Sequence, residues 1–344
     1  MRRYTPSAIV TAAVVSLGLT LGACGSGGAG GSDTVKLRLS HQWPEDDFRA
    51  ELANRFAEEA AEETGGAVEI TVYPNASLIG ANEQFEALST GAIDMSVFPL
   101  SYASGQAPEF DITMMPGLVR DHAQARTWPD SPIGERVESL ADERGVQILT
   151  WVWNSGAFAT KGDPIVTPDD IRRGMVMRGA GTSTETVLRA AGAGVSSLPS
   201  NEIYSAMQTG VLDGVTTSAS STVSFNLQEQ IDSYTAPTDH SIWFIMEPLI
   251  ISNGAWDKLT PEQQSALESV GNSLQEFAFD ASEEDDRQAS ETLEEAGVEV
   301  VEMDAAAFEQ WRDLSEQSAW ADFAQKVPAG QELLDLALQA GEDQ

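Results

Sequence analysis

The chain has one cysteine and three histidines in 344 residues. A single cysteine forms no internal disulfide, so a disulfide framework is excluded. His41, His122 and His240 show no metal-ligand spacing, and the sequence has no Walker loop, nucleophile elbow, dinucleotide-binding glycine motif or EF-hand loop. We therefore expect no cofactor, no metal and no enzymatic activity, although a Ser-His-Asp set assembled from distant residues stays open.

Basic residues are also scarce, since 19 Lys and Arg face 54 Asp and Glu for a formal net charge of −35. A body of this charge repels the phosphates of nucleic acids and anionic lipid headgroups, so neither is expected as a partner. The acidic clusters fall in helical patterns, which indicates a solvated surface rather than a store of cations. They lie at Glu58-Glu59, Glu62-Glu63 and Glu283 to Asp286.

Long apolar runs are missing after the N-terminus, where Arg2 and Arg3 precede an apolar stretch from Ala8 to Leu21. That stretch is short for a membrane span and is typical of a signal peptide. Leu21-Gly22-Ala23-Cys24 resembles a bacterial lipobox, whose cysteine is lipidated and becomes the first mature residue. We expect a lipoprotein signal peptide at 1–23, a Gly/Ser tether at 24–32, and an extracytoplasmic body anchored to the cell membrane through Cys24.

A nine-residue phrase occurs twice, 119 residues apart, at Glu86 to Asp94 and at Ser205 to Asp213. Each copy has the pattern of a helix end, a glycine with positive φ and a short buried strand. Two copies predict two similar α/β lobes, unless the likeness arose by chance. Ligands of such sheets bind beyond the carboxyl ends of the strands. The segments after the two strands, 98–101 and 217–220, are then expected to be opposing lips of one cleft.

Strand-like and helix-like patterns alternate along the body and predict an α/β protein. We expect lobe I to comprise 33–153 plus about 243–283, and lobe II 154–242 plus about 284–344. Long helical patterns follow Thr260, which opens a capping box with Gln263. The expected strands are Val35 to Leu39, Val68 to Val72, Val146 to Trp153, Met175 to Arg178, His240 to Ser252 and Val298 to Val301.

Arg178 is the most informative cation of the chain. It ends an apolar strand and precedes Gly179-Ala180-Gly181, where small residues leave the backbone open to close approach. A guanidinium in that place presents a planar fork that matches a carboxylate. The alternative is an arginine paired with one of the many acids at a domain surface.

Among the aromatic residues, Trp43 and Trp153 are the better candidates for cleft walls, because each lies at a strand-to-loop junction.

From the first strand to about Asp313 the chain resembles the solute-binding subunits of tripartite ATP-independent periplasmic (TRAP) transporters, the DctP-like family. The most specific match runs from Asn201 to Gly214, through the second copy of the repeated phrase. The other matching segments are Phe56 to Glu59, Thr64 to Ile70, Tyr73-Pro74, Gly91 to Met95, Trp153 to Gly156, Thr167 to Ile171 and Met177-Arg178.

The resemblance implies a two-lobed periplasmic-binding-protein-like fold with a hinge and long C-terminal helices, closing on an organic acid whose carboxylate meets Arg178. It implies transfer of that acid to integral-membrane permease subunits driven by an ion gradient. Sialic-acid-binding members have a second arginine where this chain has Ala157 or Phe158, so a smaller acid fits better. We expect a monomer whose other ligand-binding residues are Thr217, Ser218, Trp153, Asn154, Gln42, Trp43, Glu83, Phe98 and Pro99.

Two other classes of protein remain open at this point. One is a binding protein that serves an ATP-driven importer, which shares the lobes and the lipid anchor. The other is an anchored enzyme acting on a sugar acid, against which the missing nucleophile–base pair counts. Glu83 also has a second explanation, since an acid at a helix N-terminus is common without any ligand.

Overall fold

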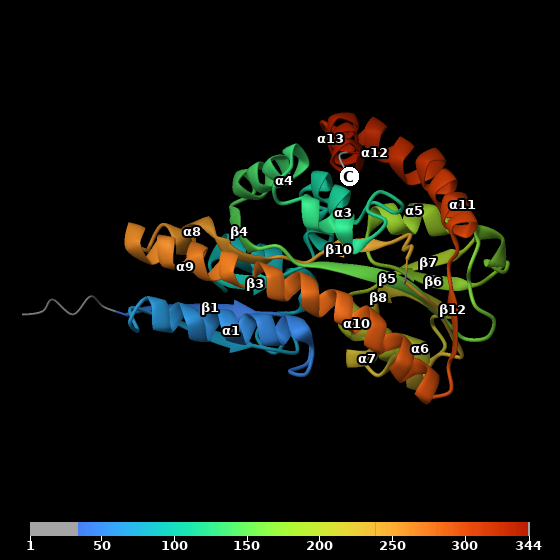
Figure 1. Cartoon of the computed structure of the whole chain (residues 1–344), viewed down its shortest axis with the longest axis horizontal. Coiled ribbons are helices and arrows are strands. Elements are labelled where there is room, and N and C mark those ends of the chain that lie inside the picture. The colour runs from blue at the N-terminus through green and yellow to red at the C-terminus, as the bar shows by residue number, and fades with distance from the viewer. Residues whose placement is uncertain (1–33, 238, 343–344) are drawn as a thin grey trace, which may run out of the picture. The chain divides into compact units, whose positions relative to one another are not determined.

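The computed structural model of the chain describes residues 34–237 and 239–342, so Cys24, the signal peptide and the Gly/Ser segment lie outside the described residues. Two β-sheets are flanked by helices (Figure 1). We call the part built on the first sheet lobe I and the part built on the second sheet lobe II. None of the helices in the described residues is long and apolar enough to cross a bilayer.

The sheet of lobe I has the strand order β2-β1-β3-β11-β4. Strand β1 is parallel to β2 and β3, and β11 is antiparallel to β3 and β4. The strands are β1 (Val35–Ser40), β2 (Val68–Tyr73), β3 (Met95–Val97), β4 (Val146–Thr150) and β11 (Leu249–Ser252). Its helices are α1 (Phe48–Glu63), α2 (Gln84–Thr90), α3 (His122–Thr127), α4 (Pro132–Glu143), α8 (Asn253–Trp256) and α9 (Pro261–Ser273).

The sheet of lobe II has the order β12-β9-β5-β8-β6-β7, with β10 paired to β5. The strands are β5 (Trp153–Thr160), β6 (Val176–Gly179), β7 (Gly194–Ser197), β8 (Gly214–Ser218), β9 (Ser233–Ala236), β10 (Phe244–Met246) and β12 (Glu299–Glu302). Its helices are α5 (Thr182–Ala190), α6 (Ile203–Gln208) and α7 (Ala219–Ser224).

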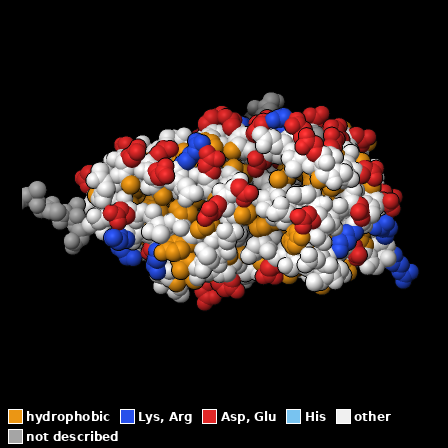
Figure 2. All heavy atoms as spheres, turned by 90° about the horizontal axis from the view of Figure 1, so that it is seen from below, with side chains coloured by type: hydrophobic (Ala, Val, Ile, Leu, Met, Phe, Trp, Pro, Cys, Tyr) orange, Lys and Arg blue, Asp and Glu red, His pale blue; other side chains and the backbone are white. Residues whose placement is uncertain are grey.

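Most of the C-terminal part of the described residues is helical. Helix α10 (Gln275–Glu295) contacts α1 and α9 of lobe I as well as α7, β5 and β12 of lobe II. Helix α11 (Ala305–Ser315) contacts α5, and α13 (Gly330–Glu342) contacts α3 and α4, with α12 (Ala321–Lys326) between them. Short 3₁₀ segments that matter below are η2 (Leu100–Ala103), η3 (Pro108–Met114) and η5 (Ser200–Glu202). Figure 2 shows Asp and Glu side chains spread over one face of the molecule, as expected for a solvated acidic surface.

The repeated phrase has the predicted structure in both copies. Helix α2 ends at Thr90 before Gly91, which has φ 71°, and α6 is followed by Gly210, which has φ 74°. The closing aspartates have the same structural role. Asp94 accepts a hydrogen bond from the backbone N–H of Arg38 (2.9 Å), and Asp213 accepts one from the N–H of Val176 (2.7 Å). Each aspartate thus fixes the strand that follows it to a neighbouring parallel strand.

Two of the expected strands are wrong, because each is interrupted where the chain passes between the sheets. The run Val146 to Trp153 divides into β4 and β5, and the run His240 to Ser252 contains only β10 and β11. At the first break the amide side chain of Gln275 bonds both the N–H and the C=O of Trp151. At the second break Pro248 has no N–H to donate to a ladder.

Asp111 of η3 connects lobe I to the first turn of α5 in lobe II. Its carboxylate accepts hydrogen bonds from the hydroxyl of Ser183 (2.7 Å) and from the backbone N–H of the same residue. Burial raises the pKa of Asp111 to about 6, although the hydrogen bonds from Ser183 act in the opposite direction and nearby Glu185 adds to the rise. This carboxylate is therefore a titratable contact between the lobes.

We predict that Asp111→Asn changes the pH dependence of stability. Because the folded-state pKa lies above the unfolded value, the folded state binds more protons between about pH 4 and 6, so this group favours folding as the pH falls. When the pH is lowered from 7 to 4.5, the difference in unfolding free energy between wild type and variant should change by about 2 kcal/mol in favour of wild type. Urea unfolding at both pH values measures this. Asp163→Asn, at a side chain that is 88% exposed, is the control and should show no such change.

Candidate functional site

Arg178 lies in β6 with only 1% of its surface exposed. Its Nε donates to the carbonyl of Leu198, its Nη1 to the carbonyl of Thr216, and its Nη2 to the hydroxyl of Tyr102, each at 2.8 Å. All three acceptors are uncharged. Within residues 34–237 and 239–342, no aspartate or glutamate forms an ion pair with this guanidinium. The alternative of an arginine paired with an acid at a domain surface is therefore wrong.

This hydrogen bonding leaves Arg178 able to bind an anion. A guanidinium has five N–H groups, and the three acceptors account for three of them. A buried charge that lacks a counter-charge is costly, and hydrogen bonds to neutral groups only partly replace its hydration. An anion placed on the remaining N–H groups would supply that counter-charge. The three protein contacts meanwhile fix the orientation of the fork.

Tyr102 connects the two lobes at this arginine. It belongs to η2, directly after β3, and its hydroxyl also accepts a hydrogen bond from the backbone N–H of Ser200 in lobe II (3.1 Å). Gln42 reaches the same residue, because its side-chain amide donates to the hydroxyl of Ser200 (2.9 Å). The ring of Phe98 lies edge-on to Tyr102, with centroids 6.2 Å apart. Phe98 thus lies next to Tyr102, which bonds Arg178, whereas Gln42 is linked to Tyr102 only through Ser200. Pro99 immediately precedes η2.

A cavity of about 230 Å³ lies beside Tyr102 and Leu198, both partners of Arg178. Residues of η2 and the loop after it form one wall, and the loops around β6 and β7 form the other. Its lining residues are Asn82, Ser101, Tyr102, Ser104, Gly105, Ala180, Gly181, Thr182, Glu185, Ser197 and Leu198. Space for a small molecule is therefore present between segments of the two lobes. Arg178 does not line this space itself but bonds two residues that do, Tyr102 and Leu198.

Thr217 and Ser218 end β8, and both are buried. The hydroxyl of Ser218 caps α7, since it accepts from the backbone N–H of Ser221 (3.1 Å). It also accepts from Nη1 of Arg49 at 3.4 Å. Ser218 is therefore occupied by contacts within the protein, whereas Thr217 follows Thr216, whose carbonyl holds Arg178.

Trp153 and Asn154 are neighbours in β5 but have different surroundings. Trp153 is fully buried and packs on Trp128 with ring centroids 4.9 Å apart. Asn154 donates from its amide to the carboxylate of Glu247 (2.6 Å). Glu83 is exposed and its carboxylate folds back on Gly80, so the described contacts do not bring it to Arg178.

A buried ionic cluster beside these residues was not anticipated. Arg49 bonds both carboxylate oxygens of Asp47 (2.7 and 2.6 Å) and donates to Glu247 (2.5 Å). Trp43 lies under the Arg49 guanidinium, 4.2 Å from ring centroid to Cζ. A sequence signal existed, because Arg49 is at helical spacing from Ala53, Phe56 and Ala60, the buried face of α1. An arginine on an apolar helix face is expected to be buried and paired.

The structure also contains a serine, a histidine and an aspartate in contact, but not in a catalytic arrangement. Ser155 donates to Oδ2 of Asp286 (2.5 Å), and Nε2 of His122 lies 2.5 Å from the same oxygen. Both groups bind the carboxylate, so the histidine does not receive a proton from the serine as a general base would. His41 is buried, unlike His122, and its burial lowers its pKa to about 4.

Comparison with known proteins agrees with this geometry. The model of the family "Bacterial extracellular solute-binding protein, family 7" (DctP) matches residues 39–326. A solute-binding protein of Albidiferax ferrireducens is 39% identical, over 90% of this chain and 92% of its own. The C4-dicarboxylate-binding periplasmic protein DctP of Rhodobacter capsulatus is 25% identical, over 91% of this chain and 92% of its own.

Among solved structures, a TRAP periplasmic solute-binding protein from Rhodoferax ferrireducens with bound malonate is similar. It has 38% sequence identity and a TM-score of 0.87, covering 89% of this chain and 98% of that one. The two-lobed α/β fold is thereby confirmed, and the proteins of this family are solute-binding receptors rather than enzymes. The chain belongs to the DctP family of bacterial extracellular solute-binding proteins, the receptors of TRAP transporters.

Proposed function

We propose that this protein captures a small organic acid between its lobes and delivers it to a TRAP-type permease. The observation that carries the proposal is the buried guanidinium of Arg178, whose protein partners are all uncharged. The carboxylate of the acid forms a two-pronged pair with the free N–H groups of Arg178. Tyr102 and Gln42 close on the ligand from lobe I, and Thr217 lines the cleft from lobe II.

A short dicarboxylate is the class of ligand that we favour. The relative from Rhodoferax ferrireducens holds malonate, and the cavity beside Tyr102 is only about 230 Å³. We propose that closure moves 33–153 plus about 243–283 against 154–242 plus about 284–344. Because β5 begins at Trp153 and β10 (Phe244–Met246) pairs with it in the second sheet, the two crossings lie within a few residues of these boundaries. Motion is expected at the two crossings, 151–152 and 247–248, where the strands are interrupted.

The two alternatives have less support. A receptor for an ATP-driven importer shares the lobes, but this chain belongs to the family of TRAP receptors. An enzyme acting on a sugar acid requires a nucleophile and a base. The Ser155, Asp286 and His122 contacts do not supply that pair.

The role of Arg178 is tested by calorimetry with malonate on wild type and on Arg178→Met, which keeps an unbranched apolar side chain and removes the guanidinium charge. Loss of one partner of a buried charge pair should weaken binding by about 3–5 kcal/mol, a hundredfold to a few thousandfold. Arg172→Met is the matched control, because Arg172 is exposed in the same lobe and pairs with Asp163 (3.0 Å), and neither residue lines the cavity. Equal affinity of wild type and the Arg178 variant would reject the proposal.

We propose in addition that Cys24 carries a lipid that holds the body at the outer face of the cell membrane. Cys24 is the only cysteine of the chain and follows a lipobox-like sequence. Cys24→Ser should move the protein from the membrane fraction to the soluble extracytoplasmic fraction without changing its affinity for malonate. Fractionation of cells expressing each form measures this, and a variant that stays with the membrane would contradict the anchor.

A further inference from the structure

The ionic cluster of Asp47, Arg49 and Glu247 contains fully buried charges that do not contact the cavity beside Tyr102. The side chains of Asp47 and Arg49 are 0% exposed and that of Glu247 is 5% exposed. Burial acts to lower the pKa of Arg49, but the two carboxylates outweigh it and raise that pKa. Replacing buried ion pairs with apolar residues is often neutral or stabilising. Packing alone therefore does not explain why an arginine occupies this position.

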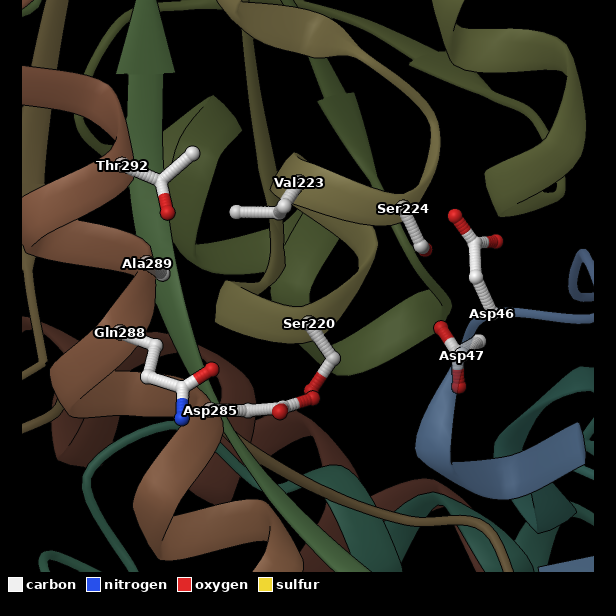
Figure 3. A pocket seen from close by; sticks show the side chains of 9 residues that line it. All are labelled: Asp46, Asp47, Ser220, Val223, Ser224, Asp285, Gln288, Ala289 and Thr292. Atoms are coloured by element: carbon white, nitrogen blue, oxygen red, sulfur yellow. The ribbon is translucent and has the colours of Figure 1, made fainter. Parts of the chain in front are cut away.

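The cluster joins segments from both lobes. Asp47 and Arg49 belong to the start of α1 in lobe I, whereas Nη2 of Arg49 donates to the hydroxyl of Ser221 in α7 of lobe II (3.1 Å). Figure 3 shows Asp47 at one side of a cavity of about 150 Å³, with Ser220 and Ser224 of α7 opposite and Asp285 of α10 beside them. Arg49 has its full set of acceptors only when α1 and α7 lie together.

Glu247 connects this cluster to the crossings between the sheets. It lies at the second crossing, where its backbone N–H donates to the carbonyl of Val152 at the first crossing (2.8 Å). Asn154, just after the first crossing, donates to the carboxylate of Glu247. Arg49 therefore contacts the crossings through Glu247 as well as α7 through Ser221.

We propose that Arg49 is the positioning residue that clasps lobe II to lobe I. Arg49 holds α7 through Ser221 and the crossings through Glu247, so its contacts keep the lobes closed for longer around a bound acid. This inference rests on the proposed function, because it assigns the closing step to the same cleft.

The test compares Arg49→Met with Arg55→Met, a matched control on the same helix whose guanidinium is partly exposed and pairs with Glu51. Stopped-flow measurement with malonate should show dissociation about tenfold or more faster for the Arg49 variant, because a hydrogen bond to a charged group is lost, and unchanged association. Ser221→Ala removes only the lobe II acceptor, should fold normally, and should speed dissociation about threefold to tenfold. The control should match wild type.

A merely structural role predicts a different pattern. In that case the variants would give less folded protein or a lower melting temperature. Malonate would still dissociate from the remaining folded protein at the wild-type rate. That result would overturn the inference. If malonate fails to bind wild type, the ligand named in the proposed function is wrong. The clasp is then tested by itself, by small-angle X-ray scattering of the ligand-free proteins. A larger radius of gyration for Arg49→Met than for wild type and Arg55→Met supports the clasp, and equal radii reject it.

Discussion

The structure depends on one buried cation that the protein itself does not neutralise. Arg178 is held by two carbonyls and a hydroxyl, so its position is fixed while its charge stays available. In water such a charge would be hydrated, and in the interior it requires an anion. In the function proposed above, this arrangement converts the cost of burying a guanidinium into affinity for a carboxylate.

The overall charge of the protein does not prevent this. The chain carries a formal charge of −35, which repels anions at long range. Salt confines that repulsion to a Debye length of roughly 8 Å, whereas a pair in contact inside a closed cleft is weakly screened. The two arginines that are buried within the described residues differ in the same local way. Arg49 is neutralised by Asp47 and Glu247, whereas Arg178 has neutral partners and is the arginine proposed to bind the ligand.

Much of the fold could be predicted from the sequence because local patterns determine it. The repeated phrase placed Gly91 and Gly210 at positive φ, and the apolar strand ending in small residues identified Arg178. The breaks at Trp151 and Pro248 could not be predicted, since a hydrophobic run does not show where the chain changes sheets. At Trp151, the backbone N–H and C=O are bonded by the side chain of Gln275, which lies on a helix more than a hundred residues later in the chain.

The remaining site residues depend on tertiary contacts. Tyr102 lies next to the predicted lip, but its bonds to Arg178 and Ser200 require the lobes to meet. Trp153 has the strand-end position of a cleft wall, yet it packs on Trp128 in the core.

A crystal structure of the protein with malonate tests the central claim most directly. We expect a ligand carboxylate within about 3 Å of the Arg178 guanidinium nitrogens. Malonate bound elsewhere, with Arg178 paired to an aspartate or glutamate of the protein, would contradict it.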